Sequence, residues 1–311
     1  MPPVNVWDAE HALDADQARQ LLAAQFPQLA LDSVEPLGVG FDNTVYLVDG
    51  EWAFRFPRRE VAVPLMAREL GLLPGLAPRL PLAVPVPELV GRPAGSYPWP
   101  FWGARQVPGL ELADAGLNDE DRVALGAQVG GFLAALHQPA VAGDLGGHLP
   151  HDPMRRGTPS TRGPMARDFL DRLAGRGSWQ PGSATDRAVD EVIAAADPLE
   201  PPDGEPVVVH GDLHLRHLLV GPDGLATGVI DWGDSCLADP ALDLSLAFGA
   251  FRGPARAALL AAYGGPLDEE RELRARVLAL CLCAALADYG DVEGYSALRA
   301  EALAGVARAV T

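Results

Sequence analysis

The spacing of apolar and polar positions divides the chain into two parts that favour different secondary structures. In residues 33–57, β-branched and aromatic residues alternate with polar ones and are interrupted by the turn sequences GVGFDN and DGE. Alternation with a period of two predicts half-buried strands, and glycine beside aspartate or asparagine predicts tight turns between them. This segment therefore predicts three antiparallel strands.

Helical spacing flanks these strands. Residues 14–26 and the sequence LMARELGLLPGL have apolar residues three and four positions apart, which predicts two helices. The first should end before Pro27, because proline disfavours helical geometry in the residue that precedes it. The proline-rich stretch 74–87 leads into another extended segment, PFWGARQV, and the first part of the chain is expected to end near Pro108.

The chain beyond Pro108 is predicted to be mainly helical. In NDEDRVALGAQVGGFLAALH, Asn118 can cap a helix whose first turn is acidic, and residues 166–197 and 254–308 also have mostly helical spacing. Between these regions, LLV and LATGVI are short β-like runs joined by GPDG, a turn sequence that predicts a hairpin. The pattern predicts an α+β chain with one domain over 1–108 and another over 109–311.

Composition narrows the class of protein. The 311 residues are 48% hydrophobic and 21% charged, which allows a substantial core and excludes a disordered or fibrous chain. The first residues have no basic segment ahead of an apolar stretch, which argues against a secretory signal. The longest apolar run, 277–287, is too short to cross a bilayer. We therefore expect a cytoplasmic protein without a membrane partner.

The net charge limits which classes of molecule the protein is expected to bind. Acidic residues outnumber basic ones by 42 to 24, which disfavours nucleic acid as a partner and attracts cations, or serves only to solvate the surface. The sequence has no lysine, so every cationic role falls to arginine or histidine. There are three cysteines, and Cys281 and Cys283 lie two apart in a helical segment; we expect core thiols.

Ionisable residues gather around the predicted hairpin. If its strands fold back on each other, Asp231 returns beside residues 214–217, so Asp212, His217 and Asp231 converge. Two carboxylates beside a third polar ligand suit a hard divalent cation and an anionic substrate. Alternatively, Asp212 and His210 only satisfy loop backbone groups. The spacing assigns no role to His214.

The spacing of these residues is typical of kinase chemistry. In kinases a catalytic-loop aspartate orients the attacking hydroxyl, a metal ligand follows after four residues, and a second aspartate begins the next motif. Here Asp212 is followed by LHLR and His217, and Asp231 opens DWGD. Three further carboxylates are expected to cap the following helix and hold the loop: Asp234, Asp239 and Asp243.

Residues 210–217, HGDLHLRH, and 230–243, IDWGDSCLADPALD, resemble the signature of the aminoglycoside and macrolide phosphotransferases, HGDLHxxN followed by IDW or IDF. The resemblance implies a two-lobed protein-kinase-like fold, with a small N-terminal antiparallel sheet lobe with a helix and a larger, mainly helical C-terminal lobe. It also implies transfer of the γ-phosphoryl of ATP or GTP to a hydroxyl of an aminoglycoside-like antibiotic, and hence antibiotic resistance.

The resemblance also assigns the residues around the hairpin. It implies that Asp212 is catalytic and that Asp231 is the main Mg²⁺ ligand. His217 stands where most members have asparagine, and imidazole is a poorer magnesium ligand than an amide oxygen.

The resemblance implies a nucleotide site in the first part. Gly38 and Gly40 lie where backbone N–H groups can approach phosphate oxygens, although two glycines in a hairpin can also mean only a hairpin. Arg55 takes the place of the cation that binds the α- and β-phosphates, and its expected partner is Glu69, with Glu60 as the alternative. A hinge whose backbone binds the purine is assigned by position to Gly103, Ala104, Arg105 and Gln106.

A candidate acceptor site lies late in the chain. LADYGDVEGY places Asp288, Asp291 and Glu293 close together, as an anionic patch or as a solvated helix end. With the formal net charge of −18, the patch favours a cationic aminoglycoside over a macrolide. A macrolide or a small metabolite of the choline, homoserine or sugar type is the alternative acceptor.

Two alternatives come from other classes of protein. A metallophosphoesterase could use a metal cluster of four residues: His210, Asp212, His214 and His217. The chain, however, has no later Gly-Asn-His motif. A kinase-like binding protein without catalysis is suggested by the departures at His217 and Arg55.

Overall fold

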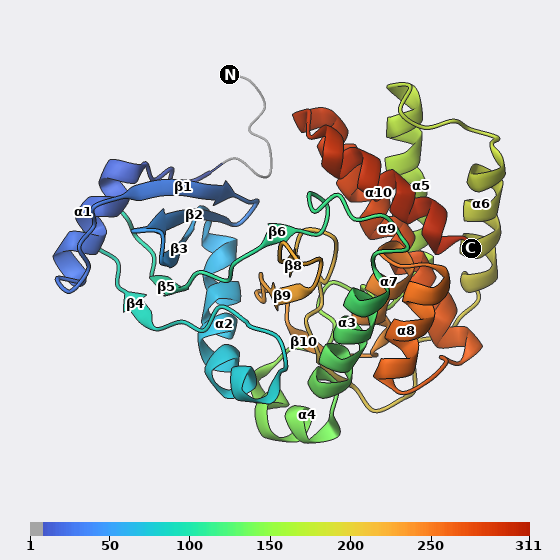
Figure 1. The fold of residues 1–311 in the computed structure, drawn as a ribbon, viewed down its shortest axis with the longest axis horizontal. Coiled ribbons are helices and arrows are strands. Elements are labelled where there is room, and N and C mark those ends of the chain that lie inside the picture. Colours follow the sequence, from blue (N-terminus) through green and yellow to red (C-terminus); the bar gives the residue numbers. More distant parts are fainter. Residues whose placement is uncertain (1–8) are drawn as a thin grey trace. The chain divides into compact units, whose positions relative to one another are not determined.

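The computed structural model describes residues 9–311; the first eight residues, where the argument against a secretory signal begins, lie outside the described part (Figure 1). The chain forms two compact units. One holds the described chain up to Pro78 together with Val84–Val107, and the other holds Arg79–Ala83 and Pro108–Thr311.

The first unit is built on a five-stranded antiparallel sheet in the order β1-β2-β3-β5-β4. The three strands predicted from alternation are present and pair in sequence. The bounds are β1 (Val34–Val39), β2 (Asn43–Val48), β3 (Trp52–Pro57), β4 (Leu89–Gly91) and β5 (Phe101–Arg105), with helices α1 (Ala15–Gln25), η1 (Glu60–Ala62), α2 (Val63–Leu76) and η2 (Ala77–Arg79).

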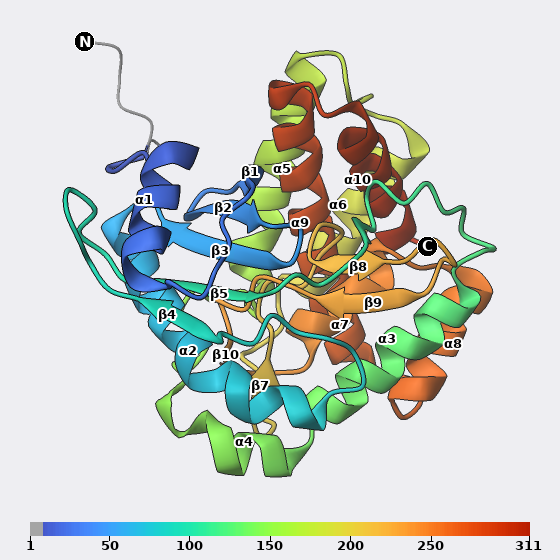
Figure 2. The same ribbon diagram turned by 60° about the vertical axis from the view of Figure 1, so that its left-hand side comes forward.

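Alternation along the central strands gives each face of this sheet its own helix. Phe54, Phe56 and Phe101 are buried together with residues of α1. Trp102, the next residue of β5, is buried with Met66 of α2. Figure 2 shows α1 and α2 beside the strands. Because side chains alternate between faces, Arg55 is directed toward the α2 face.

The second unit is mainly helical and carries two small sheets. One sheet has the order β6-β8-β9 and the other pairs β10 with β7. The strands are β6 (Leu110–Glu111), β7 (Val207–Val209), β8 (Leu218–Val220), β9 (Ala226–Val229) and β10 (Cys236–Ala238). The helices are α3 (Val123–Leu136), α4 (Pro139–Leu145), η3 (Gly146–His148), α5 (Pro159–Gly175), α6 (Ala184–Ala196), α7 (Ala241–Gly249), α8 (Gly253–Tyr263), α9 (Glu269–Glu293) and α10 (Ser296–Ala309).

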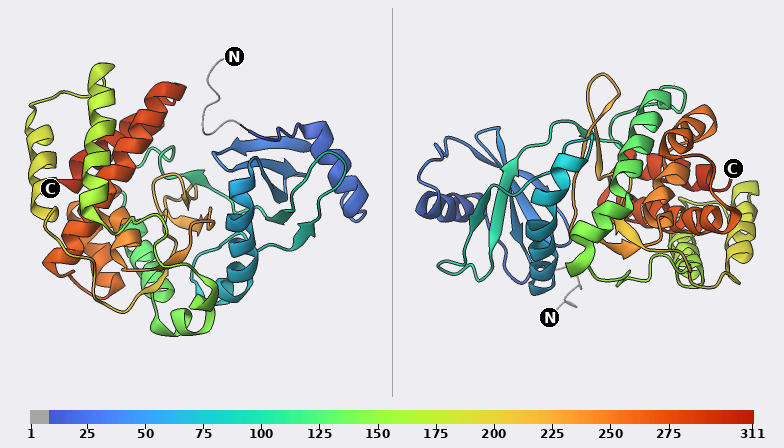
Figure 3. Two further views of the ribbon diagram at one scale, coloured as in Figure 1. Left: turned by 180° about the vertical axis from the view of Figure 1, so that it is seen from behind. Right: turned by 90° about the horizontal axis from the view of Figure 1, so that it is seen from below.

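The helices of this unit pack in pairs, and Figure 3 shows the long helix α9 with α5 and α10 each lying against it. Helices α3 and α8 approach closely at glycine. A Cβ atom at Gly130 would lie 2.1 Å from the carbonyl oxygen of Leu259, whereas one at the neighbouring Gly131 would meet nothing within 4 Å. Gly130 is therefore required by the helix contact, and Gly131 is not.

Helix α3 begins later than predicted. The side chain of Asn118 accepts hydrogen bonds from the N–H groups of Glu120 and Asp121, at 2.9 and 3.0 Å, but these belong to a turn, and the helix starts at Val123. The reason lies in Arg122. Its buried guanidinium donates to the carbonyl of Ala250 and pairs with Glu301, so the turn positions this side chain before the helix begins.

The three cysteines are core thiols, as predicted. Cys236, Cys281 and Cys283 are free and buried, and burial raises the pKa of Cys236 and of Cys283 to about 12. A membrane-spanning helix is absent from residues 9–311, since none there is long and apolar enough to cross a bilayer.

Candidate active site

The β8–β9 hairpin brings the predicted residues of the second unit together. Leu218 pairs with Val229, and the N–H of Ile230 donates to the carbonyl of His217 at 2.9 Å. The end of β9 therefore lies beside the start of β8 (Figure 1). As a result, Nε2 of His217 is 3.6 Å from Oδ2 of Asp231. Asp231 has a left-handed φ of 67°, which turns the chain sharply at this point.

The loop before β8 is held by one buried carboxylate. Asp243 accepts hydrogen bonds from the N–H groups of His210 (2.8 Å) and Gly211 (3.0 Å), and from Nε2 of His137 (3.1 Å). Gly211 has a φ of 85°, and a Cβ atom there would lie 2.4 Å from the carbonyl oxygen of Asp234. Burial acts to raise the pKa of Asp243, but the hydrogen bond and charge of His137 outweigh it and lower the pKa.

The three carboxylates expected to cap the following helix have separate tasks. Asp239 accepts a hydrogen bond from the N–H of Ala241, the first residue of α7, and pairs with Arg271. Asp243 holds the loop, as described above, and Asp234 pairs with Arg156. Asp239 therefore binds the first N–H of α7 from the position before the N-cap residue Pro240, whereas Asp243 lies inside the first turn of α7 and faces the loop.

His210 fixes the backbone of Asp212. Its Nε2 lies 2.9 Å from the carbonyl oxygen of Ile230, and its Nδ1 lies 3.3 Å from the amide nitrogen of Asp212. A carbonyl can only accept and an amide N–H can only donate, so this ring is a neutral imidazole with its proton on Nε2. Burial lowers the pKa of His210 and favours the same neutral form, although the Asp243 carboxylate opposes it.

Asp212 lies among cations and imidazoles. Its Oδ1 is 3.2 Å from the guanidinium of Arg156, and its Oδ2 is 3.6 Å from Nε2 of His214. Its backbone carbonyl is 2.8 Å from Nδ1 of His217. The rings of His214 and His217 stack with centroids 3.8 Å apart. Burial, reinforced by the nearby His217 and Arg216, places the pKa of His214 well below its ordinary value.

Two arrangements of metal ligands arise here. Ligand atoms of Asp212, His214 and His217 lie within 4.8 Å of one another. His210 does not join them, because both of its ring nitrogens face backbone groups. The second arrangement is Asp231 with Nε2 of His217, whose other nitrogen is engaged by Asp212. A separation of 3.6 Å is compatible with one cation bound at about 2.1 Å from each atom.

Arg156 is the residue that sequence reasoning missed. Its guanidinium contacts both Asp212 Oδ1, at 3.2 Å, and Asp234 Oδ2, at 2.9 Å. It lies in the loop between η3 and α5, far from the hairpin in sequence, and no spacing rule links an Arg-Arg pair there to the HGDLH segment. Only tertiary structure brings this cation to Asp212.

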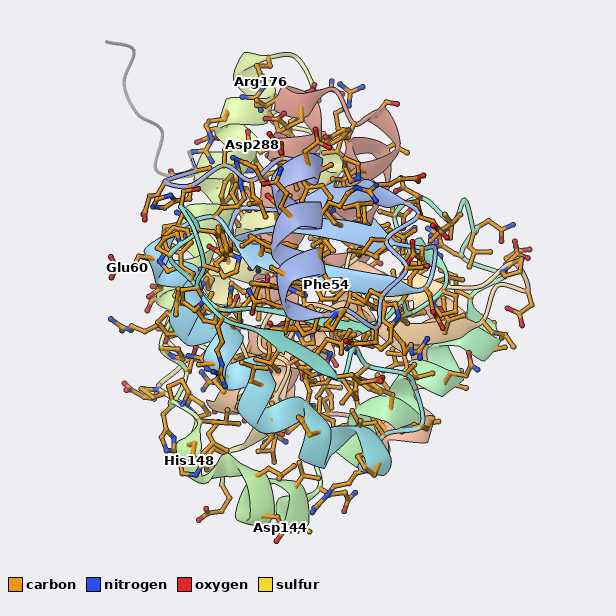
Figure 4. The ribbon with its side chains drawn as sticks, turned by 90° about the vertical axis from the view of Figure 1, so that its left-hand side faces the viewer. Phe54, Glu60, Asp144, His148, Arg176 and Asp288 are labelled. Atoms are coloured by element: carbon orange, nitrogen blue, oxygen red, sulfur yellow. The ribbon has the colours of Figure 1, made fainter. Side chains whose placement is uncertain are left out.

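In the first unit, Arg55 pairs with the partner predicted first. Its guanidinium is 3.5 Å from Oε1 of Glu69 on α2, whose side chain is only 1% exposed, and it lies 5.6 Å from the centroid of the Trp102 ring. Glu60, the alternative partner, is exposed at the start of η1 (Figure 4). The arginine therefore presents a buried, ion-paired cation on the α2 face of the sheet.

The glycines and the predicted hinge also lie in the first unit. Gly38 is near the end of β1, and Gly40 begins the turn to β2, where its N–H donates to the carbonyl of Asn43 at 2.9 Å. The carbonyl of Gly103 accepts from the N–H of Glu88, and the N–H of Gln106 donates to the carbonyl of Glu51, each at 2.9 Å. Two backbone groups of the predicted hinge segment, which also contains Ala104 and Arg105, are therefore engaged within the unit.

The late acidic residues do not form a free anionic patch. Asp288 pairs with Arg172 in the last turn of α5 and with Arg176 just after it, and Figure 4 shows Asp288 near Arg176. Asp291 pairs with Arg176 and Arg299, and hydrogen bonds from Ser178 and from these two arginines lower its pKa. Glu293, the last residue of α9, is exposed. Arginines from other helices therefore compensate most of the patch.

Residues 33–276 match the model of the phosphotransferase enzyme family, APH. The chain therefore belongs to this family. It is a phosphotransferase with the protein-kinase-like fold of the antibiotic kinases and an alcohol group as its acceptor. Both the resemblance and the fold predicted from the sequence are confirmed, and the metallophosphoesterase alternative is wrong.

Solved structures agree with this fold. The GDP complex of wild-type aminoglycoside 2'-phosphotransferase-IIIa superposes with a TM-score of 0.67 at 21% identity, over 96% of this chain and 98% of that chain. Macrolide 2'-phosphotransferase MphH from Brachybacterium faecium has a TM-score of 0.57 at 25% identity, over 94% and 97%. A curated relative, the uncharacterized protein YcbJ of Bacillus subtilis (strain 168), is 46% identical over 39 residues, 12% of this chain and 13% of its own length.

Proposed function

We propose that the protein transfers the γ-phosphoryl group of ATP or GTP to a hydroxyl of an aminoglycoside-like antibiotic, with Mg²⁺ as cofactor. The observation that carries this proposal is the position of Asp212. Its carboxylate lies at the head of the hairpin, in the loop that also carries His217, and His217 faces Asp231. In a phosphotransferase that acts on alcohols, this is the arrangement of an orienting carboxylate beside a metal-binding one.

We assign a task to each site residue of the second unit. Asp212 orients the acceptor hydroxyl and takes its proton as the oxygen–phosphorus bond forms. The ring of His210 accepts a hydrogen bond from the backbone N–H of Asp212 and so holds that residue in place. Asp231, with His217 beside it, would hold Mg²⁺, which when bound supplies positive charge to the phosphate oxygens. Carboxylate oxygen suits this ion, so the residues present fit it.

The first unit has the proposed task of binding nucleotide. We assign this role to a lobe over 1–108 and the chemistry and acceptor to a lobe over 109–311. Arg55, oriented by Glu69, would bind the α- and β-phosphates through a planar guanidinium. Backbone groups near Gly38 and Gly40 would approach the phosphates, and the segment of Gly103, Ala104, Arg105 and Gln106 would approach the purine. The GDP complex of the aminoglycoside relative supports a purine nucleotide without deciding between ATP and GTP.

The aminoglycoside acceptor is supported by charge. The formal net charge of −18 attracts a polycation, and an aminoglycoside 2'-phosphotransferase is among the structural relatives. Because Asp288 and Asp291 are paired with arginines, their contribution to acceptor binding would require those ion pairs to open, while Glu293 is already exposed. A cytoplasmic site of action, where nucleoside triphosphate is available, and a role in antibiotic resistance belong to the same proposal.

A macrolide is the second candidate acceptor, and a specific observation favours it. Met154 is 53% exposed and lies two residues before Arg156, which contacts Asp212. Met165 is also exposed, and the buried Arg162 contacts both methionines. Flexible, exposed apolar side chains around the loop that carries Arg156 suit a large, mostly apolar acceptor.

The test is a phosphorylation screen of aminoglycosides, macrolides and small metabolites with ATP and with GTP. We expect turnover of an aminoglycoside, with an acceptor KM that rises as salt is added. Asp212→Asn should lower kcat on the order of 10²–10⁴-fold and leave nucleotide affinity nearly unchanged. Turnover by Asp212→Asn at the wild-type rate would contradict the catalytic role. Salt-insensitive turnover of a neutral metabolite would contradict the acceptor but not the kinase.

A further inference from the structure

We infer that Arg156 is a positioning residue for the phosphoryl transfer: its guanidinium bridges Asp212 and Asp234 and fixes which oxygen of Asp212 faces the acceptor hydroxyl. This inference rests on the proposed catalytic role of Asp212. It adds a residue from outside both signature segments to the machinery of the reaction.

The contacts of Arg156 fit a bridge. One terminal nitrogen lies 3.2 Å from Oδ1 of Asp212 and 2.9 Å from Oδ2 of Asp234, and the side chain is only 13% exposed. Burial acts to lower the pKa of Arg156, but the charges of Asp212 and Asp234 outweigh it and raise the pKa. The side chain is therefore a permanent cation between two carboxylates that would otherwise repel each other.

The loop that carries Arg156 is strained and tied to the strand after Asp234. Asp152 and Arg155 have left-handed φ angles of 27° and 50°. Such angles are costly for residues other than glycine and persist only where the surroundings enforce them. The carboxylate of Asp152 accepts from the N–H groups of Arg156 and Gly157, each at 2.8 Å. The backbone of Asp152 donates to Leu237 of β10 at 3.1 Å.

This geometry determines the orientation of Asp212. Its Oδ1 is bound by Arg156, and its backbone carbonyl is bound by Nδ1 of His217. Oδ2, on the side of His214, is then the oxygen that accepts the hydroxyl proton. A cation at Oδ1 makes a carboxylate less basic, so the contribution of Arg156 is orientation and not basicity. Orientation of the reacting groups can by itself account for a large part of a rate enhancement.

Substitutions in the full-length protein test this role, with Mg²⁺ and the best acceptor from the screen. Arg156→Met should lower kcat by about 10²-fold, as expected for a misplaced catalytic group, while the nucleotide KM changes less than about twofold. Arg156→Lys should recover part of the loss, because an ammonium keeps the positive charge but sits on a flexible stem and lacks the planar guanidinium geometry. Arg155→Met, at the exposed neighbouring position, is the matched control and should retain wild-type kcat.

Asp234→Asn provides an independent variant that leaves Arg156 in the chain. If the bridge acts as a unit, Asp234→Asn should lower kcat, and Asp234→Asn combined with Arg156→Met should be no slower than Arg156→Met alone. Millimolar guanidinium should restore part of the kcat of Arg156→Ala and none of Asp212→Asn. Thermal unfolding of each variant shows whether a loss comes from misfolding.

The outcomes separate this inference from the proposed function. Wild-type kcat in Arg156→Met, or losses that add fully between Arg156→Met and Asp234→Asn, would overturn the positioning role. If Arg156→Met does not fold, wild-type kcat in a folded Asp234→Asn would overturn it as well. Full activity of Asp212→Asn would overturn the proposed function itself, whereas an inactive Asp212→Asn beside a fully active Arg156→Met removes only the role of Arg156.

Discussion

Oδ2 of Asp243, in the first turn of α7, accepts a 2.8 Å hydrogen bond from the backbone N–H of His210. Because the same carboxylate also binds Gly211 and His137, it joins α7, α3 and the loop that leads to Asp212. The position of the proposed catalytic carboxylate thus depends on a buried acceptor thirty-one residues after it in the sequence.

Replacing this acceptor should destabilise the fold. Asp243→Asn substitutes an N–H₂ donor for one carboxylate oxygen and leaves a buried N–H or imidazole without a partner. We expect the free energy of unfolding to fall by about 3 kcal/mol. Urea denaturation measures this loss. Asp171→Asn is the control, because its side chain is 69% exposed and forms a surface ion pair, so it should cost under about 1 kcal/mol. Equal effects would contradict the role of Asp243.

Two adjacent glycines in α3 should respond in opposite directions. In Gly130→Ala the new methyl group meets the carbonyl oxygen of Leu259 in α8, so we expect a loss of about 1–3 kcal/mol in unfolding free energy. Gly131→Ala has open space and should gain about 0.5–1 kcal/mol from helix propensity. Chemical denaturation of both variants measures these changes in unfolding free energy. A stabilised Gly130→Ala would mean that α3 and α8 can move apart easily.

Arg55→Met should raise the nucleotide KM by about 10-fold or more, because a charged hydrogen bond to phosphate is worth about 1.5–3 kcal/mol. Arg55→Lys keeps a cation near Glu69 and should stay close to the wild-type KM. Initial-rate kinetics at varied ATP and GTP give the comparison. Since Arg55→Met leaves the buried Glu69 with one partner fewer, thermal unfolding must first show that the variant is folded. An unchanged KM would move phosphate binding to another residue.

His217→Asn should retain activity with Mg²⁺ and need less of the ion, since an amide oxygen suits magnesium better than imidazole nitrogen does. The measurement is the dependence of rate on Mg²⁺ concentration. Asp231→Ala is the reference variant and should weaken metal-dependent nucleotide binding. If His217→Asn is inactive but folded, the contact of His217 Nδ1 with the carbonyl of Asp212 matters more than any metal contact.

Stability should fall as the pH drops below about 6.5. Burial lowers the pKa of His210 and of His214 in the folded chain. Below the ordinary histidine pKa, the unfolded chain therefore binds more protons than the folded chain does. Stability is complete above the ordinary histidine pKa and is lost toward the lower folded values. The lowered pKa of Asp243 adds a loss only below about pH 4.

Denaturation at pH 7.5 and 5.5 checks this dependence. His210→Asn should be less stable at both values but lose less between them than the wild type does. His148 is exposed (Figure 4), and His148→Asn should keep the wild-type dependence. Identical stability of the wild type at the two values would contradict the neutral tautomer of His210.

Local sequence rules were sufficient where the structure is local. The turn sequence GPDG fixed the hairpin, and its register alone brings Asp231 to His217. Alternation along β3 likewise directs Arg55 away from Phe54 and Phe56 and toward α2. In both cases the contact follows from one hairpin or one strand and its nearest neighbours in the sequence.

The errors and omissions come from residues distant in sequence. Arg156 reaches Asp212 from a strained loop, and Arg122 delays the start of α3 because its guanidinium is needed at Ala250 and Glu301. The acidic patch looked free because Arg172, Arg176 and Arg299 are supplied by α5 and α10. A charge in a sequence does not reveal which counter-charge the fold will bring to it.

The guanidinium of Arg55, packed between Glu69 and Trp102, also decides how this protein can be detected. Acylating reagents that report nucleotide sites do so by modifying a lysine amine, and this chain contains no lysine. Surveys of that kind would leave its proposed nucleotide site unmarked. Dicarbonyl reagents, which condense with guanidinium groups, are the suitable probes, and protection of Arg55 by bound nucleotide would be their readout.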